Sequence, residues 1–424
     1  MNAKKKELKF LLIPNASKFY DINQLIEIKK QLLNYGHQAD LMDDKIDDLT
    51  LINFLSQNNY DFVFRVNRGR PRELNKKIRF ISWFQDFYFD SESELESLMD
   101  GDISYFYTSK RAFGIKKKPK CFSSLLYPGI SEKNVTNGLF DISNKLKIEN
   151  FQNLEFSICG YIPAGVHINF NPLFYRNFEI KDKCNFDSVL ENRLRRFLKN
   201  KDKISIEKTK EVIIFLQALT EINYEPLSGN LNVNLISKKI KNKTLEVFGS
   251  ANKSILNQLI RLFSTDYPRF LDRITLARLI SQFSSNYALV GGGWSAYNEF
   301  SEFCRGEIQD QNELYSIYKK SKINIYNNTH GLGMHSKVFE IMINGGFLAL
   351  PFSNNNKKES GIEESFEPEK HFVYFDPFKF DDLIEKWLHN EKKRIQIGEN
   401  ARKNVIKNHS WQKRVAKILN DLKK

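Results

Sequence analysis

Cysteine is scarce in this chain of 424 residues, which contains four, and none of them form a Cys-x-x-Cys pair. This spacing is typical of reduced, mostly buried thiols and argues against a disulfide framework or a zinc site. The seven histidines include no His-Glu-x-x-His motif, so metal catalysis has no support in the sequence. We therefore expect neither a bound metal nor a cofactor.

Long hydrophobic runs are also absent. The longest apolar stretches, such as Phe10–Pro14 and Phe347–Phe352, are far shorter than the roughly 20 residues that cross a bilayer. The amino-terminal segment has a basic start but only a short apolar run and no small-residue cleavage site, so it is unlike a signal peptide. These absences predict a cytoplasmic protein, either free or at the inner face of the membrane.

Positive charge is plentiful, since 65 Lys and Arg residues outnumber 51 Asp and Glu residues and give a net charge of +14. Residues 191–280 alone hold 17 basic and 9 acidic residues. Such a surplus attracts polyanions, including nucleic acid, anionic lipid and phosphorylated substrates. No RNP, zinc-finger or helix-turn-helix signature accompanies the charge, so we expect no nucleic acid among the partners.

Two α/β domains account for the length and the patterning. A chain of 49.8 kDa exceeds what one hydrophobic core usually supports. In residues 1–150, short apolar runs alternate with amphipathic ones, which predicts a doubly wound parallel sheet. The strands expected there are 8–14, 37–42, 61–66, 78–84 and 103–108, and the expected helices are 21–34, 47–57 and 91–99.

A second α/β domain is predicted over residues 151–424. Its first strand begins at Leu154, and strands and helices alternate again from residue 287, with one short strand expected around Gly306–Ile308. Residues 169–283 contain mainly helical segments, which predicts a helical insertion. We expect the last helix of the chain to pack back on the amino-terminal domain.

Residues 316–351 are the most informative for function. A strand ending at Asn327 is followed by Gly331 and Gly333, and then a helix begins. The glycines allow close approach of a ligand and the helix N-terminus offers free N–H groups, so the turn suits a phosphate or pyrophosphate. Lys337 could pair with that charge, and Glu340 could accept hydrogen bonds from ribose hydroxyls. The alternative is a plain chain turn beside a solvated Lys337–Glu340 pair.

Residues 285–420 contain, in order, ALVGGGW, CRGEIQ, ELYSIYKKSKI, NIYN, then Gly-x-x-x-Lys-x-Phe-Glu and a Gly-Gly pair before an aliphatic strand. This order resembles the carboxyl-terminal domain of GT-B glycosyltransferases, most closely the CgeB-like, group 1 branch. The resemblance is thin over residues 1–165, where it rests on short motifs such as WFQD and YPGI. It implies an α/β fold of GT-B architecture, with two Rossmann-like domains facing a cleft.

The resemblance also implies a set of donor contacts. They are the ribose bound by Glu340, the diphosphate bound by Gly331, Gly333 and Lys337, and the base met by backbone near Ile308. One departure is present, because many retaining members carry a Glu eight residues before the ribose Glu, where this chain has Leu332. Retention of configuration is therefore not implied.

Other side chains are candidates for chemistry. His330 and His335 flank the phosphate turn and either protonate the leaving group or are surface residues. Gly292 and Gly293 follow a strand and either lie beside the nucleotide or form an ordinary strand exit. Asp86 ends the strand-like ISWFQD, at the mouth of the expected cleft. It is the candidate general base if the enzyme inverts, and a capping or turn residue otherwise.

Acceptor contacts are expected from basic residues. Arg65 and Asn67 lie at the end of the strand before Asp86, and they either bind an acidic acceptor or are ordinary loop residues. Arg68 and Arg70 are interpreted as solvated loop charges. The insertion adds three arginines, which are Arg193, Arg195 and Arg196.

The sequence therefore predicts a glycosyltransferase that moves a sugar, without a metal, from a nucleotide-diphosphate sugar to a glycan, lipid-linked or protein acceptor. Peripheral contact with an anionic membrane is a further expectation. The alternative function is a non-catalytic protein that binds a nucleotide sugar or a polyanion.

Overall fold

The computed structural model describes residues 6–16, 19–74, 78–86, 91–110, 115, 118–131, 154–162, 206–249, 256, 259–308, 310–327 and 333–424. The chain divides into two compact units. The first unit comprises Met1–Asn137 and Asn404–Lys424, and the second comprises Gly138–Lys403. The expected boundary near residue 150 and the first part of the expected insertion lie outside the described residues.

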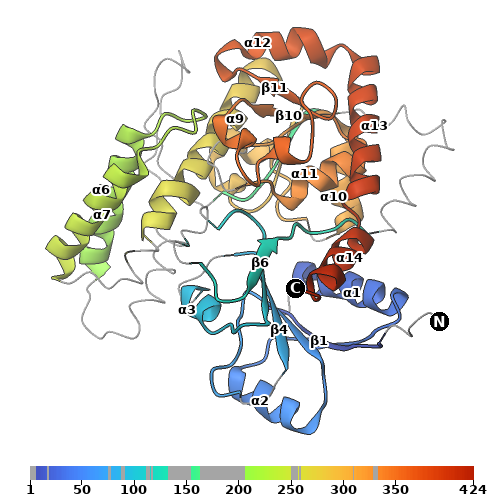
Figure 1. Cartoon of the computed structure of the whole chain (residues 1–424). Helices are drawn as coiled ribbons and strands as arrows, with labels where there is room; N and C mark the ends of the chain where they lie inside the picture. Colours follow the sequence, from blue (N-terminus) through green and yellow to red (C-terminus); the bar gives the residue numbers. More distant parts are fainter. Residues whose placement is uncertain are drawn as a thin grey trace. The chain divides into compact units, whose positions relative to one another are not determined.

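The first unit contains a parallel sheet whose six described strands lie in the order β2-β1-β3-β4-β5-β6 (Figure 1). The strands are β1 (Lys9–Ile13), β2 (Gln38–Leu41), β3 (Phe62–Val66), β4 (Arg79–Phe84), β5 (Ile103–Phe106) and β6 (Phe122–Leu125). Continuous apolar runs are typical of parallel strands covered on both faces, and β3 is buried at every residue. Strand β6 was not predicted, because its sequence FSSL lacks such a run and its residues are only half-buried.

Helices connect the parallel strands of the first unit, because a parallel pair needs a crossover. They include α1 (Phe19–Asn34), α2 (Asp48–Gln57) and α3 (Ser91–Glu96). Helix α2 begins where Asp47 accepts a hydrogen bond from the backbone N of Thr50 at 2.9 Å. The expected helices at 21–34, 47–57 and 91–99 therefore start within two residues of the observed ones.

The last helix, α14 (Trp411–Asp421), belongs to the first unit and packs on α1 (Figure 1). Ser410 caps it by accepting a hydrogen bond from the backbone N of Lys413 at 3.3 Å. The indole of Trp411 meets that of Trp83 edge to face, with ring centroids 6.1 Å apart. A Cβ at Gly129 would lie 2.7 Å from the backbone of Trp411, so glycine permits this close approach.

The second unit contains another parallel sheet, with five described strands in the order β11-β10-β9-β7-β8. The strands are β7 (Leu154–Cys159), β8 (Tyr287–Val290), β9 (Ser321–Ile325), β10 (Leu348–Pro351) and β11 (Val373–Phe375). Strand β7 has β8 on one side and β9 on the other, so successive crossovers run in opposite directions.

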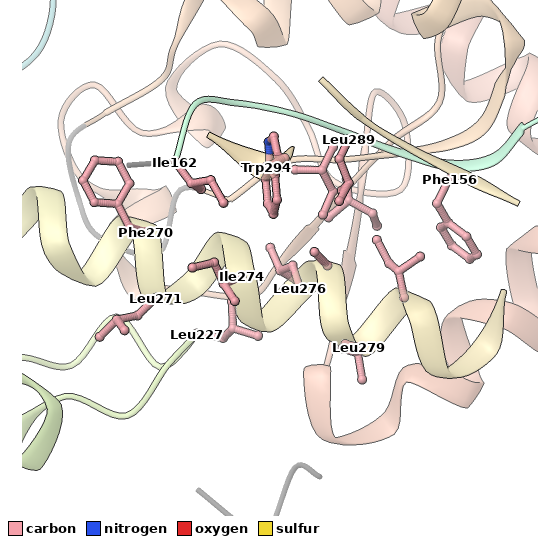
Figure 2. Close-up of a cluster of buried hydrophobic side chains, with 14 of the residues drawn as sticks. Phe156, Ile162, Leu227, Phe270, Leu271, Ile274, Leu276, Leu279, Leu289 and Trp294 are labelled. Atoms are coloured by element: carbon pink, nitrogen blue, oxygen red, sulfur yellow. The ribbon is translucent and has the colours of Figure 1, made fainter. Parts of the chain in front are cut away.

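Helix α9 (Tyr267–Phe283) carries much of the core of the second unit. Figure 2 shows Phe270, Ile274 and Leu276 of α9 together with Phe156 and Leu289 of β7 and β8. The sequence placed α9 inside the helical insertion, but it packs on the sheet. The remaining insertion helices in the described part are α6 (Ile206–Asn223) and α7 (Val233–Phe248), which form a hairpin.

The other described helices follow the alternation that the sequence predicted. The α-helices are α10 (Gln311–Lys320), α11 (Ser336–Ile343), α12 (Phe380–Leu383) and α13 (Glu391–Asn408). Short segments of 3₁₀- or π-helix lie at Leu262–Asp266, Trp294–Ala296, Asn298–Phe303, Asn354–Lys357, Ile362–Glu364, Pro377–Lys379 and Ile384–Leu388.

The prediction of a short strand around Gly306–Ile308 is wrong. No strand forms among the described residues there, and Cys304 makes only an isolated bridge with Leu289. Gly306 adopts φ 65°, a left-handed conformation that ends an extended run.

Candidate functional site

The carboxyl ends of β7 and β9 form the switch point of the second sheet. The chain passes from β7 to β8 on one side of the sheet, whereas β9 leads to β10 on the other. Open α/β sheets bind ligands in the crevice outside such a point. Gly160 and Tyr161 follow β7 there, and Tyr326 and Asn327 follow β9.

Two basic side chains, Lys337 and Arg273, meet at this switch point. Lys337 is in the first turn of α11, and its Nζ donates to the carbonyl O of Cys159 at 3.1 Å. Arg273 of α9 donates from Nε to Oδ1 of Asn327 at 3.3 Å and from Nη1 to the carbonyl O of Tyr161. In the part of the chain that the structure describes, neither cation forms a salt bridge with a carboxylate.

Both cations are held at an electrostatic cost. Burial, followed by the charge of Arg273, lowers the pKa of Lys337 to about 8. Burial, followed by the charge of Arg269, lowers the pKa of Arg273 to about 9. A bound anion would offset both effects, because an opposite charge favours the protonated forms. Arg273 is buried and Lys337 is half-buried, and groups with such perturbed pKa values at a sheet edge are candidates for a functional site.

His335 begins α11 and holds its first turn. Its Nδ1 accepts a hydrogen bond from the backbone N of Lys337 at 3.3 Å, and its own backbone N donates to the hydroxyl of Tyr326 at 3.1 Å. Loss of solvation around the ring, followed by the charge of Lys337, lowers the pKa of His335, although part of the residue remains exposed. Gly333, at φ 86°, precedes this cap. The structure thus assigns His335 a capping role, and its part in protonation stays a prediction.

Glu340 lies one turn further along α11 and is 8% exposed. The hydroxyl of Tyr318, a fully buried residue of α10, donates to its Oε2 at 3.3 Å. Burial raises the pKa of Glu340, an effect that Lys337 and hydrogen bonds from Ser336 and Tyr318 oppose. The solvated Lys337–Glu340 pair that the sequence left open is therefore not found, because the carboxylate is enclosed and oriented.

The glycine turn after β8 has a packing reason of its own. Gly291 has φ 126°, and a Cβ there would lie 2.6 Å from the carbonyl O of Gly160. Gly293 also has a positive φ, at 92°, and a Cβ at Gly292 would meet a neighbouring carboxylate at 2.8 Å. The turn after β8 is thus folded closely against the turn after β7. A contact of Gly292, Gly293 or Ile308 with a nucleotide stays a prediction.

Asp86 lies at the carboxyl edge of the first sheet, just after β4, and is exposed. Asn67 fixes this turn, since its Oδ1 accepts hydrogen bonds from the backbone N of Gln85 at 2.7 Å and of Asp86 at 3.0 Å. Asn67 is buried and adopts φ 56°. Its side-chain oxygen therefore serves the fold, and its predicted contact with an acceptor stays a prediction.

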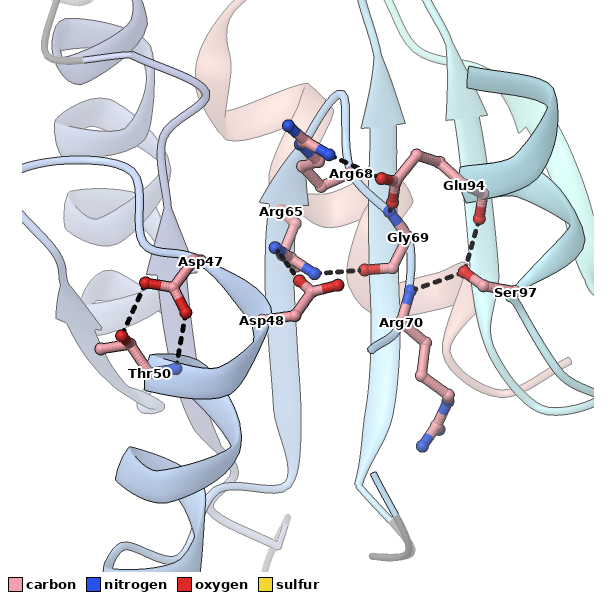
Figure 3. A network of polar contacts seen from close by, with 9 residues as sticks. All are labelled: Asp47, Asp48, Thr50, Arg65, Arg68, Gly69, Arg70, Glu94 and Ser97. Atoms are coloured by element: carbon pink, nitrogen blue, oxygen red, sulfur yellow. Dashed lines mark hydrogen bonds and ion pairs between the residues drawn. The ribbon is translucent and has the colours of Figure 1, made fainter. Parts of the chain in front are cut away.

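Three arginines, one at the end of β3 and two just after it, each pair with a carboxylate in the first unit. The pairs are Arg65 with Asp48 at 2.9 Å, Arg68 with Glu94 at 2.7 Å, and Arg70 with Asp102 at 3.0 Å. Figure 3 shows the first two pairs and the hydrogen bond from Arg65 to the carbonyl O of Gly69. Arg70 was interpreted as a solvated loop charge, which is wrong, because it is 8% exposed. Its partner is 32 residues away in the chain, so local sequence does not reveal the burial.

Arg273 is the site residue that the sequence interpretation missed. It was counted only among the basic residues of the insertion. A signal was present, because Arg273 lies between Phe270 and Ile274 in a helix whose other residues are mostly buried. A charged residue within an apolar helix face indicates either a buried pair or a ligand.

Five predicted site residues, His330, Gly331, Arg193, Arg195 and Arg196, lie outside the described residues. Their roles stay predictions.

Among the described residues, no group of three or more His, Cys, Asp or Glu side chains is arranged to hold a metal ion. Asp100 and Asp102 have the alternate spacing that metal-binding carboxylates can use. Asp102, however, accepts hydrogen bonds from Arg70 and from the backbone N of Phe80 and of Met99. Among the described helices, none combines the length and the apolar character needed to cross a bilayer.

Comparison with known families matches residues 268–420 to the family described as glycosyl transferase-like. The matched range contains Arg273, Lys337 and Glu340. The comparison with curated protein sequences found no match.

Solved structures with similar folds span nearly the whole chain. The structure of Anabaena HepE in complex with UDP and glucose aligns with 98% of this chain and 100% of that chain, at a TM-score of 0.51 and 9% identity. A glycosyltransferase from Rickettsia africae ESF-5 aligns with 99% of this chain and 98% of that chain, at a TM-score of 0.49 and 10% identity. The chain has the GT-B fold, with two Rossmann-like units, and residues 268–420 have the sequence pattern of glycosyl transferase-like proteins.

Proposed function

We propose that this protein transfers a sugar from a nucleotide-diphosphate donor to a glycan, lipid-linked or protein acceptor. One observation carries the proposal: Lys337 and Arg273 meet at the switch point, beside the N-terminus of α11, without a carboxylate partner in the described residues. A diphosphate provides the charge that this pair lacks. The family match covers both residues, and HepE, which has the same fold, was solved with UDP and glucose.

The leaving group is stabilised by charge at this point. When the bond between the anomeric carbon and the diphosphate oxygen breaks, negative charge grows on that oxygen. The N–H groups at the start of α11 and the two cations are fixed in place to receive it. We propose that they serve where a divalent ion serves in other transferases, so that transfer needs no metal.

The nucleoside is oriented by Glu340. Its carboxylate accepts hydrogen bonds from the ribose hydroxyls, and Tyr318 holds the carboxylate in place by donating to Oε2. The enclosed position of Glu340 makes these bonds stronger than in water.

The acceptor is activated by Asp86 if the reaction inverts configuration. The carboxylate takes the proton from the acceptor hydroxyl, whose oxygen then attacks the anomeric carbon. The exposed position of Asp86 at a strand end leaves it accessible to an acceptor.

A second candidate function is a protein that binds a nucleotide sugar without turnover. The presence of Leu332 where many retaining enzymes have a glutamate favours it.

The test is nucleotide release by the purified chain with UDP-, GDP- and dTDP-sugars, and with a CMP-sugar as the monophosphate control, with and without EDTA. We expect one donor to be turned over, activity to survive chelation, and Glu340→Ala to abolish donor binding. Asp86→Asn should lose turnover and keep donor binding. Binding without turnover of any donor would favour the second function, and the absence of both would contradict the proposal.

A further inference from the structure

The hairpin of α6 and α7 exposes an unusual number of apolar side chains. Its inner side packs into the core of the second unit through Val212, Leu216, Ile236 and Ile240. Six large apolar residues of the hairpin are exposed: Ile214 (64%), Phe215 (37%), Ile222 (82%), Val233 (45%), Leu235 (36%) and Leu245 (41%). We name these six residues the apolar face.

The exposed apolar side chains of the described residues are concentrated on this hairpin. It holds six of the 14 large hydrophobic side chains that are exposed in the described residues, within two adjacent helices. Single exposed apolar residues are normal, but a cluster of them indicates a surface that binds a protein, a membrane or a ligand.

The exposed side chains on α6 follow one line. Ile214, Ala218 and Ile222 are four residues apart and therefore lie above one another on the helix surface. Phe215 lies beside them, and the Nζ of Lys243 on α7 is 5.4 Å from the centroid of its ring. This contact joins the exposed surfaces of the two helices at Phe215 and Lys243.

Basic residues accompany the apolar face. Lys238, Lys239 and Lys241 are exposed on α7, and in the described part of the chain none of them forms a salt bridge. Lys243, in contrast, pairs with Glu211 and Glu246, each at 2.7 Å. The charge left without a partner on α7 is therefore positive.

We propose that the apolar face and these three lysines bind the surface of a bilayer that contains anionic lipids. The isoleucines and Phe215 enter the boundary between headgroups and acyl chains, while the lysines extend their ammonium groups to the anionic headgroups. The positive charge of the three lysines favours an anionic bilayer over a second copy of the chain as the binding partner. A twofold interface would place the same lysines of two copies near each other.

The experiment is flotation of the full chain with vesicles of phosphatidylcholine alone or with phosphatidylglycerol added. We expect the parent to float with the anionic vesicles only, and the bound fraction to fall at high salt. Ile214→Ser combined with Ile222→Ser should lower the bound fraction at least tenfold. The matched control is Ile26→Ser combined with Ile395→Ser, which removes two isoleucines that are 45% and 43% exposed on other helices and should bind like the parent.

A second comparison separates the local lysines from the net charge. Lys238→Gln, Lys239→Gln and Lys241→Gln together should abolish binding to anionic vesicles. The same three changes at Lys392, Lys393 and Lys403, which are exposed on α13, alter the net charge equally and should leave binding unchanged.

Several results would overturn the inference. They are a parent that binds no vesicle, equal binding to neutral vesicles, or equal losses in both lysine triples. A dimer in sedimentation that the Ile214→Ser and Ile222→Ser changes disperse would assign the apolar face to a second copy instead. Nucleotide release measured without vesicles does not depend on this surface, so a failure here is distinct from a failure of the proposed transferase activity.

Discussion

The two parallel sheets hold their basic residues in opposite ways at their carboxyl edges. In the first unit, Arg65, Arg68 and Arg70 each pair with a carboxylate at 3.0 Å or less. In the second unit, Arg273 and Lys337 donate to an amide oxygen and to backbone carbonyls. The paired arginines hold loops to the sheet, whereas the other two are cations that a ligand can neutralise.

The comparison explains why burial alone does not identify a binding site. Arg70 and Arg273 are similarly buried, at 8% and 7% exposure. Only the second lacks a carboxylate partner among the described residues. The partner, rather than the degree of burial, therefore distinguishes the arginine that closes a salt bridge from the one that we propose binds a ligand.

The largest expected effect is a difference in stability between variants in which Arg70 or Arg273 is replaced. Arg70→Met leaves the carboxylate of Asp102 buried without its partner, so we expect the free energy of unfolding to fall by about 3–5 kcal/mol. Arg273→Met leaves no carboxylate unpaired and should change stability by less than about 1 kcal/mol. Denaturant titration of the full chain measures both. Equal losses in the two variants would remove the distinction between the units.

A smaller effect is expected from the residue that orients Glu340. Tyr318→Phe removes the hydrogen bond to Oε2, so we expect about tenfold weaker UDP binding, the size of one bond to a charged group. It should also reduce the preference for UDP over 2′-deoxy-UDP, because a misplaced Glu340 carboxylate no longer accepts a hydrogen bond from the ribose 2′-hydroxyl.

The matched control for that change is Tyr315→Phe on the same helix. Tyr315 is also buried, and its ring centroid lies 6.4 Å from that of Tyr318, but its hydroxyl has Gln311 as its partner. Weakening by both variants to the same extent would point to a general effect on α10 rather than to positioning of Glu340.

The smallest expected effect is on pH dependence. Because the pKa of Lys337 is lowered to about 8, the unliganded protein loses this charge above that pH. A diphosphate prefers the protonated lysine, so the Kd of UDP should rise up to about tenfold per pH unit above pH 8. Lys337→Arg should keep its charge and bind with little change over the same pH range, because a guanidinium stays protonated there.

Unfolding does not produce the same pH profile. A lysine whose folded pKa lies below its ordinary value of 10.5 binds fewer protons when folded between pH 8 and 10.5. Its contribution to stability therefore increases with pH over that interval. A Kd that rises identically in the parent and in Lys337→Arg would contradict the role given to Lys337.

Much of the fold was predictable because its signals are local. Each of these elements is specified by residues of its own segment. Examples are the apolar runs at β1, β3 and β4 and the helix start at Asp47. The short strand β6 and the packing of α9 on the sheet were missed, because neither depends on a pattern within its own segment. The GT-B fold followed from the order of motifs in residues 285–420.

The site was predictable where one segment carries it and not where distant segments meet. Lys337 and Glu340 are close in the sequence and lie on one helix. Arg273 is 64 positions before Lys337 and reaches the switch point only because α9 packs on β7. The buried pair of Arg70 and Asp102 was missed for the same reason, since its members are brought together by the sheet.

Calorimetric titration of UDP into the parent chain and into Arg273→Met measures whether the cations at the switch point bind a diphosphate. We expect UDP to bind the parent, and we expect the variant, still folded and about as stable, to bind it at least tenfold more weakly. The same affinity in both proteins would show that the cations at the switch point of the second sheet do not hold a diphosphate.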